Sequence, residues 1–159
     1  MSQDAPIEKP QIRRAEPADT IGLADLRYRL WPDHPREGHA ADLGDFFADK
    51  ASRLAQENFV AVLADGEIVG FVEAGLRSHA NGCDPKQPVG FIEGWFVAEP
   101  YRRRGIGAML VRAAEDWARS KGCKEMASDT QIENVDSRRA HEGLGYAVVE
   151  TCIDFRKEL

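Results

Sequence analysis

The stretch Arg102-Arg103-Arg104-Gly105-Ile106-Gly107 decides the fold class of this chain. It follows an apolar, strand-like segment, residues 89–97, and opens an amphipathic segment that reaches residue 121. Glycines let the backbone approach a ligand closely, and the first turn of a helix carries N–H groups with no partner inside the helix. Together with the helix dipole and the three guanidinium groups, these donors predict a binding site for a pyrophosphate.

Two better-known phosphate-binding loops do not fit this stretch. The dinucleotide-binding pattern requires a third glycine where this chain has Leu110, and its loop normally opens the domain. A Walker loop requires Gly-Lys followed by Ser or Thr, which the stretch lacks. The alternative that stays open is a helix that begins beside a basic patch and binds nothing.

Composition limits the classes of protein to consider. The chain has 159 residues, a net charge of -6 and three cysteines without CxxC spacing. We expect a flexible tail over 1–10 and a single domain over 11–159. The acidic balance argues against nucleic acid as a partner, and no apolar run approaches the ~20 residues that span a membrane. Without a signal peptide, and with unpaired cysteines, a cytoplasmic location is expected. The four histidines lack the spacing of a metal site.

Hydrophobic periodicity predicts the order β-α-α-β-β-β-α-β-α-β, a mixed α/β sheet in one domain. An Asp65-Gly66 pair predicts a hairpin turn. The predicted strands are 11–15, 59–63, 68–76, 89–97, 124–128 and 146–155. The first predicted helix begins at Pro17 and stops before Pro32. Three further helices are predicted over 40–56, 105–121 and 135–142.

With this order of elements, the chain resembles the GCN5-related N-acetyltransferase (GNAT) family, whose acetyl-CoA motif is Arg/Gln-x-x-Gly-x-Gly/Ala. Arg102, Gly105 and Gly107 match that motif. The resemblance implies a mostly antiparallel sheet flanked by helices and splayed in the middle to form a cleft for acetyl-CoA. It implies these cofactor-binding residues: Trp95, Phe96 and Val97, whose backbone would pair with the pantetheine arm; Arg102, Arg103, Arg104, Gly105, Ile106 and Gly107 at the pyrophosphate; and Asn134.

The chain departs from this family at one position. Many members carry a tyrosine shortly before the last strand, where it can protonate the departing thiolate. His141 stands at that position, and Tyr146 stands where the family has phenylalanine. His141 is therefore the candidate general acid. The alternatives are a histidine that only packs or faces solvent, and a proton taken from water.

Four segments are similar to a narrower group, the aminoglycoside 6′-N-acetyltransferases: 30–35, 81–84, 93–97 and, most specifically, 121–130. The similarity implies transfer of acetyl from acetyl-CoA to the 6′-amino group of an aminoglycoside, which gives antibiotic resistance, and a homodimer. Related enzymes place an aromatic residue near position 79 into the partner's site, and this chain has His79 there. The alternatives are an acetyltransferase acting on a polyamine or another small amine, and a non-catalytic acyl-CoA sensor.

Transfer to an amine requires groups that accept a proton, because only the neutral amine attacks a thioester. With a lysine-like pKa of ~10.4, deprotonation at neutral pH costs about 4–5 kcal/mol. Carboxylates can bind the ammonium and relay its proton. Glu93 is the first candidate, with Asp129 at the end of the next strand and Glu150 in the last predicted strand, although strand carboxylates often just face solvent. The remaining candidates for substrate binding are Trp31, by cation–π contact, His34 and His79.

Overall fold

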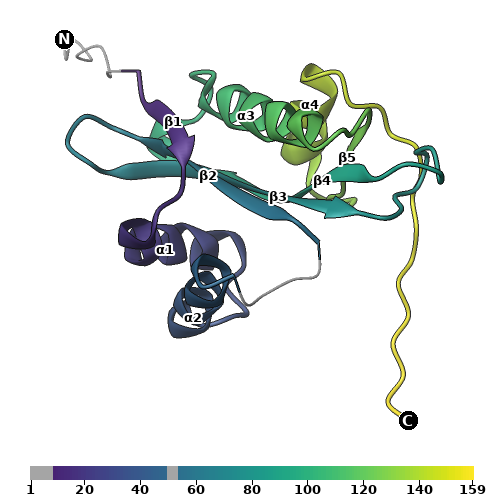
Figure 1. Ribbon diagram of the computed structural model, residues 1–159, viewed down its shortest axis with the longest axis horizontal. Coiled ribbons are helices and arrows are strands. Elements are labelled where there is room, and N and C mark those ends of the chain that lie inside the picture. Colours follow the sequence, from purple (N-terminus) through teal and green to yellow (C-terminus); the bar gives the residue numbers. More distant parts are fainter. Residues whose placement is uncertain (1–8, 50–53) are drawn as a thin grey trace.

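The computed structural model describes residues 9–49 and 54–159, so most of the predicted tail over 1–10 lies outside the described residues. One sheet separates two pairs of helices (Figure 1). Helices α1 (Thr20–Leu30) and α2 (Arg36–Phe47) lie below it, and α3 (Ile106–Ser120) and α4 (Val135–Gly143) lie above it. None of the helices in the described residues has the length and apolar character needed to cross a membrane.

The sheet has five strands in the order β1-β2-β3-β4-β5. The first four strands form three antiparallel pairs, and β5 runs parallel to β4. The predicted mixed, mostly antiparallel sheet is therefore confirmed. The strands are β1 (Gln11–Arg14), β2 (Gln56–Val62), β3 (Ile68–Arg77), β4 (Val89–Val97) and β5 (Met126–Ser128), and two short 3-10 helices cover Pro17–Asp19 and Glu99–Tyr101.

Strand β5 pairs with only the first half of β4. Pairing between them ends at Ile92 and Ser128, whereas β4 continues beside β3 as far as Val97. Beyond Ile92, the edge of β4 that faces away from β3 has no strand beside it in the described part of the chain. The predicted splay of the sheet is therefore confirmed, and it leaves backbone groups of β4 without ladder partners.

A β-bulge interrupts the pairing of β3 with β4 at Glu93. Glu73 pairs with Gly94 and Ala74 pairs with Ile92, so Glu93 is the extra residue in β4. Bulges re-aim side chains and are common beside active sites. Here the bulge lies at the residue where β4 parts from β5.

Each face of the sheet has its own core. The stripe of α3 that contains Leu110, Val111 and Ala114 packs on the face that presents Val72 and Ile92. On the other face, Phe71 and Val60 pack against Leu23, Leu26 and Leu43 of α1 and α2. This arrangement confirms the amphipathic pattern predicted for the segment after the arginine–glycine stretch.

Two predicted elements were wrong in part or whole. The helix predicted over 40–56 begins earlier, at Arg36, because Pro35 provides the extended residue that precedes it. It also ends earlier, at Phe47, and Asp49 has a left-handed φ of 56° that no helix continues. The end of that prediction falls on residues 50–53, which lie outside the described residues.

The closing strand predicted over 146–155 is absent. Residues 147–159 form no helix and no strand, and all of them are exposed. Figure 1 shows this segment as an extended yellow trace that leaves the rest of the fold. Strand propensity has no effect without a partner, because a strand is stabilised by its ladder and by packing across the sheet.

Candidate active site

The arginine–glycine turn gives α3 an uncapped start. Arg103 has a φ of 60° and Gly105 a φ of 79°, so the chain turns through left-handed conformations just before Ile106. No side chain caps the first N–H groups of α3. An added Cβ at Gly105 would meet nothing within 4 Å. The turn therefore offers unpartnered donors next to open space, which fits the pyrophosphate of a CoA molecule.

The three arginines have different surroundings. Arg102 Nε donates to the Val97 carbonyl at 2.7 Å, and its guanidinium lies 5.2 Å from the centre of the Phe96 ring. Arg102 therefore ties the turn to the end of β4. Arg103 and Arg104 are exposed, so an anion can reach their guanidinium groups.

Gly107 lies close to the Trp95 side chain. An added Cβ there would lie 2.9 Å from Cζ2 of Trp95, so a larger residue at this position would require the indole ring to shift. Within the described residues, the buried indole Nε1 of Trp95 has no hydrogen-bond partner. An orphaned buried donor beside the unpaired edge of β4 is unusual and marks this part of the sheet for ligand contact.

His141 is held at both ring nitrogens. Nδ1 lies 2.7 Å from the Ser137 carbonyl, which can only accept, so Nδ1 carries the proton. Nε2 then accepts from the Ser128 hydroxyl at 2.9 Å. The ring also packs edge-on against Trp95 and Tyr146. His141 thus joins α4 to the end of β5, beside the gap between β4 and β5.

Tyr146 donates its phenolic proton to Glu115 at 2.9 Å. Burial raises the pKa of Tyr146 well above its ordinary value, and the hydrogen bond to Glu115 raises it further. This hydroxyl therefore stays protonated, and it fixes the end of α4 against α3.

Of the three predicted carboxylates, Glu93 has the best-defined position. Arg77 holds it through two hydrogen bonds, Nε to Oε1 at 3.0 Å and Nη2 to Oε2 at 2.6 Å. The Arg77 guanidinium in turn lies 3.4 Å from the centre of the Phe91 ring. The hydrogen bond to Glu93 raises the pKa of Arg77, and the charge of Asp129 adds to this effect. Asp129 is exposed just after β5, and its charge acts on Arg77 without a direct ion pair among the described residues.

Glu73 is a carboxylate that the sequence analysis missed. Its side chain is 14% exposed, and its Oε1 lies 3.0 Å from Nε of Arg27 in α1. Burial raises the pKa of Glu73 to about 7, against the opposing attraction of Arg27, and the charge of Glu93 raises it further. A signal was available: Glu73 is the one acidic residue inside the apolar stretch 69–76.

Trp31 and the loop after it form a packed unit below the sheet. The Trp31 ring lies over Gly94, which leaves no room for a side chain at that position. The Arg27 guanidinium is 5.6 Å from the Trp31 ring centre, so Trp31 already has a cationic neighbour. His39 Nε2 lies 3.2 Å from the Trp31 carbonyl, and His34 pairs with Asp42 at 3.2 Å. The ligand atoms of His34, His39 and Asp42 lie within 4.8 Å of one another, a grouping that sequence spacing did not reveal.

Three predicted site residues lie apart from these groups. Asn134 caps α4, since its Oδ1 accepts from the Ser137 N–H at 3.1 Å. His79 is exposed in the loop between β3 and β4. Glu150 is exposed in the segment that leaves the fold. The structure therefore pairs Glu93 with Arg77, whereas Glu150 lies apart from both.

Comparison with known proteins identifies the family. A family model described as "Acetyltransferase (GNAT) family" matches residues 23–146. The chain belongs to the GNAT family. It is 41% identical over 150 residues to the aminoglycoside N(6′)-acetyltransferase type 1 of Klebsiella aerogenes, which spans 94% of this chain and 97% of that protein. It is 44% identical over 133 residues to the protein of the same name from Salmonella typhimurium, 83% of this chain and 88% of that one.

Solved structures agree with this assignment. AAC(6′)-Iy in complex with the bisubstrate analogue CoA-S-monomethyl-acetylneamine matches with a TM-score of 0.85 and 37% identity, over 96% of this chain and 100% of that one. AAC(6′)-Iy in complex with CoA matches with a TM-score of 0.86 and 38% identity, over 98% and 99%. The GNAT resemblance drawn from Arg102, Gly105 and Gly107 is confirmed.

This GNAT chain separates two kinds of group on the two faces of its sheet. Glu73 and Arg27 lie on the side of α1, with Glu93 and Arg77 beside them. Trp95 and His141 lie on the side of α3 and α4. The unpaired edge of β4 lies between the two groups. An acyl donor held along that edge would therefore meet acidic groups from one side and the His141–Ser128 pair from the other.

Proposed function

We propose that this GNAT enzyme transfers an acetyl group from acetyl-CoA to the 6′-amino group of an aminoglycoside, by direct attack in a ternary complex. The observation that carries the proposal is the position of Glu93: it stands at a bulge, is fixed by Arg77, and lies where β4 loses its neighbour β5. The sequence relatives named aminoglycoside N(6′)-acetyltransferase support the choice of acceptor.

Acetyl-CoA supplies the activated acetyl group as a thioester. The residues proposed to hold it are Arg103 and Arg104, the first-turn N–H groups of α3, the backbone of 95–97 along the unpaired edge, and Asn134. The N–H of Val97 is proposed to stabilise the oxyanion that forms when the amine attacks. The open space at Gly105 fits this assignment.

Glu93 and Asp129 are proposed to bind the ammonium groups of the drug, since a substrate with several amines needs several acidic partners. Glu93 accepts the proton of the attacking amine, directly or through water. Glu73, whose pKa of about 7 suits proton transfer at neutral pH, is a second acceptor on the same side of the sheet. His141 is proposed to protonate the departing thiolate after it has taken a proton at Nε2. Trp31, His34 and His79 are proposed to line the drug site.

A thiol-release assay tests this function. With acetyl-CoA, we expect rapid thiol release with tobramycin or kanamycin, slow release with spermidine, and a product acetylated at the 6′ nitrogen by NMR. Faster turnover of spermidine would favour the small-amine alternative. No turnover of any amine, together with tight CoA binding, would favour the acyl-CoA sensor.

We further propose that the enzyme is a homodimer in the cytoplasm. The exposed apolar side chains of 147–159 support a partner, because a monomer rarely leaves so many large apolar groups in water. The three cysteines, all unpaired, suit a reducing compartment.

A further inference from the structure

We infer that His34, His39 and Asp42 form a binding site for a divalent transition-metal ion, of which zinc fits best. The site lies at the start of α2 and takes no part in the acetyl transfer proposed above. The ligand atoms of these three side chains lie within 4.8 Å of one another, the one such grouping of three in the part of the chain that the structure describes. Sequence spacing did not predict it, because His34 comes from the loop before the helix.

The loop and the helix bring the three side chains together. His39 and Asp42 are three residues apart in α2, so they lie on the same face of the helix. The His34 backbone N–H donates to the Trp31 carbonyl at 3.3 Å, which turns the loop back toward the helix. The His34 ring covers Gly38, where an added Cβ would lie 2.5 Å from Nε2. Glycine at position 38 therefore leaves the space that the ring fills.

His39 supplies the observation that points to a metal ion. It is only 2% exposed. Its Nε2 lies 3.2 Å from the Trp31 carbonyl, which can only accept, so Nε2 carries the ring proton. Nδ1 is then a bare acceptor, and among the described residues this buried atom has no hydrogen-bond partner. Buried polar atoms without a partner are rare in folded proteins, and a metal ion would satisfy this one.

The contact with the Trp31 carbonyl is also typical of a metal-binding histidine. Histidine ligands almost always donate their second ring N–H to a carbonyl or a carboxylate, which fixes the tautomer and makes the free nitrogen more basic. His39 has this arrangement before any ion binds. The imidazole is therefore already held in the protonation state that a metal requires.

His34 and Asp42 complete the site from the solvent side. His34 Nε2 and Asp42 Oδ2 are 3.2 Å apart. This is close to the separation of about 3.4 Å between ligand atoms in a tetrahedral site with metal–ligand bonds of about 2.1 Å. Both side chains are about half exposed. They can therefore rotate toward His39, and an ion can enter between them.

The ligand set selects the class of ion. Two imidazole nitrogens and one carboxylate suit zinc, and a water molecule would complete four ligands. Magnesium and calcium prefer sites made of oxygen ligands, and this cluster has one carboxylate. We therefore expect zinc to bind and magnesium not to bind. Because the ion would join the loop before α2 to the helix itself, zinc should also raise the melting temperature of the chain.

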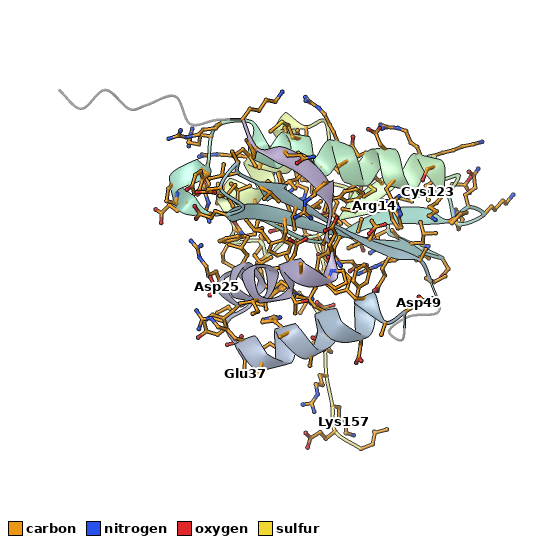
Figure 2. The ribbon with its side chains drawn as sticks, turned by 60° about the vertical axis from the view of Figure 1, so that its left-hand side comes forward. Arg14, Asp25, Glu37, Asp49, Cys123 and Lys157 are labelled. Carbon is orange, nitrogen blue, oxygen red and sulfur yellow. The ribbon has the colours of Figure 1, made fainter. Side chains whose placement is uncertain are left out.

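Calorimetric titration of the full, untagged chain with zinc chloride tests the site. The chain carries Cys83→Ser and Cys152→Ser, because accessible thiolates also bind zinc. Cys123 is kept, because it is buried and Figure 2 shows it on the opposite side of the sheet from Glu37 of α2. We expect one zinc ion per chain and no binding of magnesium. No zinc binding, or equal affinities for zinc and magnesium, would overturn the inference.

Variants of the two exposed ligands locate the ion. Loss of a group that only supports a ligand weakens metal binding 10–100-fold, so we expect His34→Gln and Asp42→Asn each to weaken zinc binding by about 100-fold. The matched controls are His79→Gln and Asp45→Asn, the same changes at exposed positions outside the cluster, which should bind zinc as before. Circular dichroism checks that all four variants fold. Equal zinc affinities in either variant and its control would overturn the inference.

His39 is tested without a substitution, because loss of a buried side chain destabilises the fold. A long-range proton–nitrogen correlation spectrum of the imidazole rings reports which nitrogen carries the proton. We expect zinc to shift the His39 Nδ1 resonance to that of a metal-bound nitrogen while Nε2 keeps its proton. His39 nitrogen resonances that do not respond to zinc would overturn the inference. None of these measurements uses turnover, so their failure would leave the proposed acetyl transfer untouched.

Discussion

Arg77 binds Glu93 through both of its carboxylate oxygens, at 3.0 and 2.6 Å, across the bulge between β3 and β4. A two-point guanidinium–carboxylate pair fixes direction as well as distance. The Arg77 side chain is itself held by contact with the Phe91 ring. The bulge and the arginine therefore set the orientation of Glu93 before any substrate arrives.

Replacing Glu93 tests its proposed role with the amine. Glu93→Gln keeps the shape and one acceptor for Arg77 but removes the charge. We expect kcat at neutral pH to fall about 100-fold, in line with the loss of a general base, and CoA affinity to change little. The matched control is Glu57→Gln, which removes a carboxylate paired with Arg14 in the β1–β2 part of the sheet. An unchanged pH–rate profile in Glu93→Gln would contradict the proton-relay role.

Gly105 tests the pyrophosphate site. Aspartate and alanine at this position both adopt a φ of 79° at some cost, and neither side chain meets a neighbour at Cβ. Only aspartate adds a negative charge at the start of α3. We therefore expect Gly105→Asp to weaken CoA binding at least tenfold more than Gly105→Ala, measured by titration calorimetry. Equal affinities for CoA in the two variants would contradict the assignment.

Glu73 makes stability depend on pH. Its pKa is raised in the folded state to about 7 from 4.5, so the folded chain holds a proton that the unfolded chain has released between these pH values. The free energy of unfolding should therefore fall as pH rises from 4.5 to 7, by about 3 kcal/mol from this group. Urea unfolding of the wild type and of Glu73→Gln at pH 4.5, 5.5 and 7 isolates the contribution of Glu73 to the free energy of unfolding. All other titratable groups are the same in the two chains. A difference between the two chains that does not change with pH would show that Glu73 has an ordinary pKa.

His141 tests the source of the proton for the thiolate. His141→Asn retains a hydrogen-bonding side chain but cannot take up a proton. We expect kcat to fall about 100-fold, with little change in the KM for acetyl-CoA. A rise in that KM with little change in kcat would instead mean that His141 only positions Trp95 and Ser128. Ser128→Ala, which removes the hydrogen bond to Nε2, separates the two effects further.

Local patterns predicted most of the fold. The strand 89–97, the glycine at the start of α3 and the hairpin turn at Gly66 were read correctly, because alternation and left-handed turns depend on neighbouring residues. The predicted bounds of the second helix, 40–56, were wrong because Pro35 is the N-cap residue of α2, which begins at Arg36.

The candidate site was predicted less completely. Glu93 was identified from its place in a strand, but Arg77 was missed because the pair depends on the register of β3 against β4. Glu73 was missed because its raised pKa arises from burial and from Arg27 in another layer.

The sequence by itself determined the strand–turn–helix around Arg102 to Gly107, since glycine conformations and helix periodicity are properties of adjacent residues. It also indicated the GNAT family, because that motif is contiguous. Only the tertiary structure decided which groups face one another: Glu93 with Arg77, His141 with Ser128, and the residues after Val149 with no strand in their own chain. Those pairings depend on contacts between distant segments, which sequence spacing does not encode.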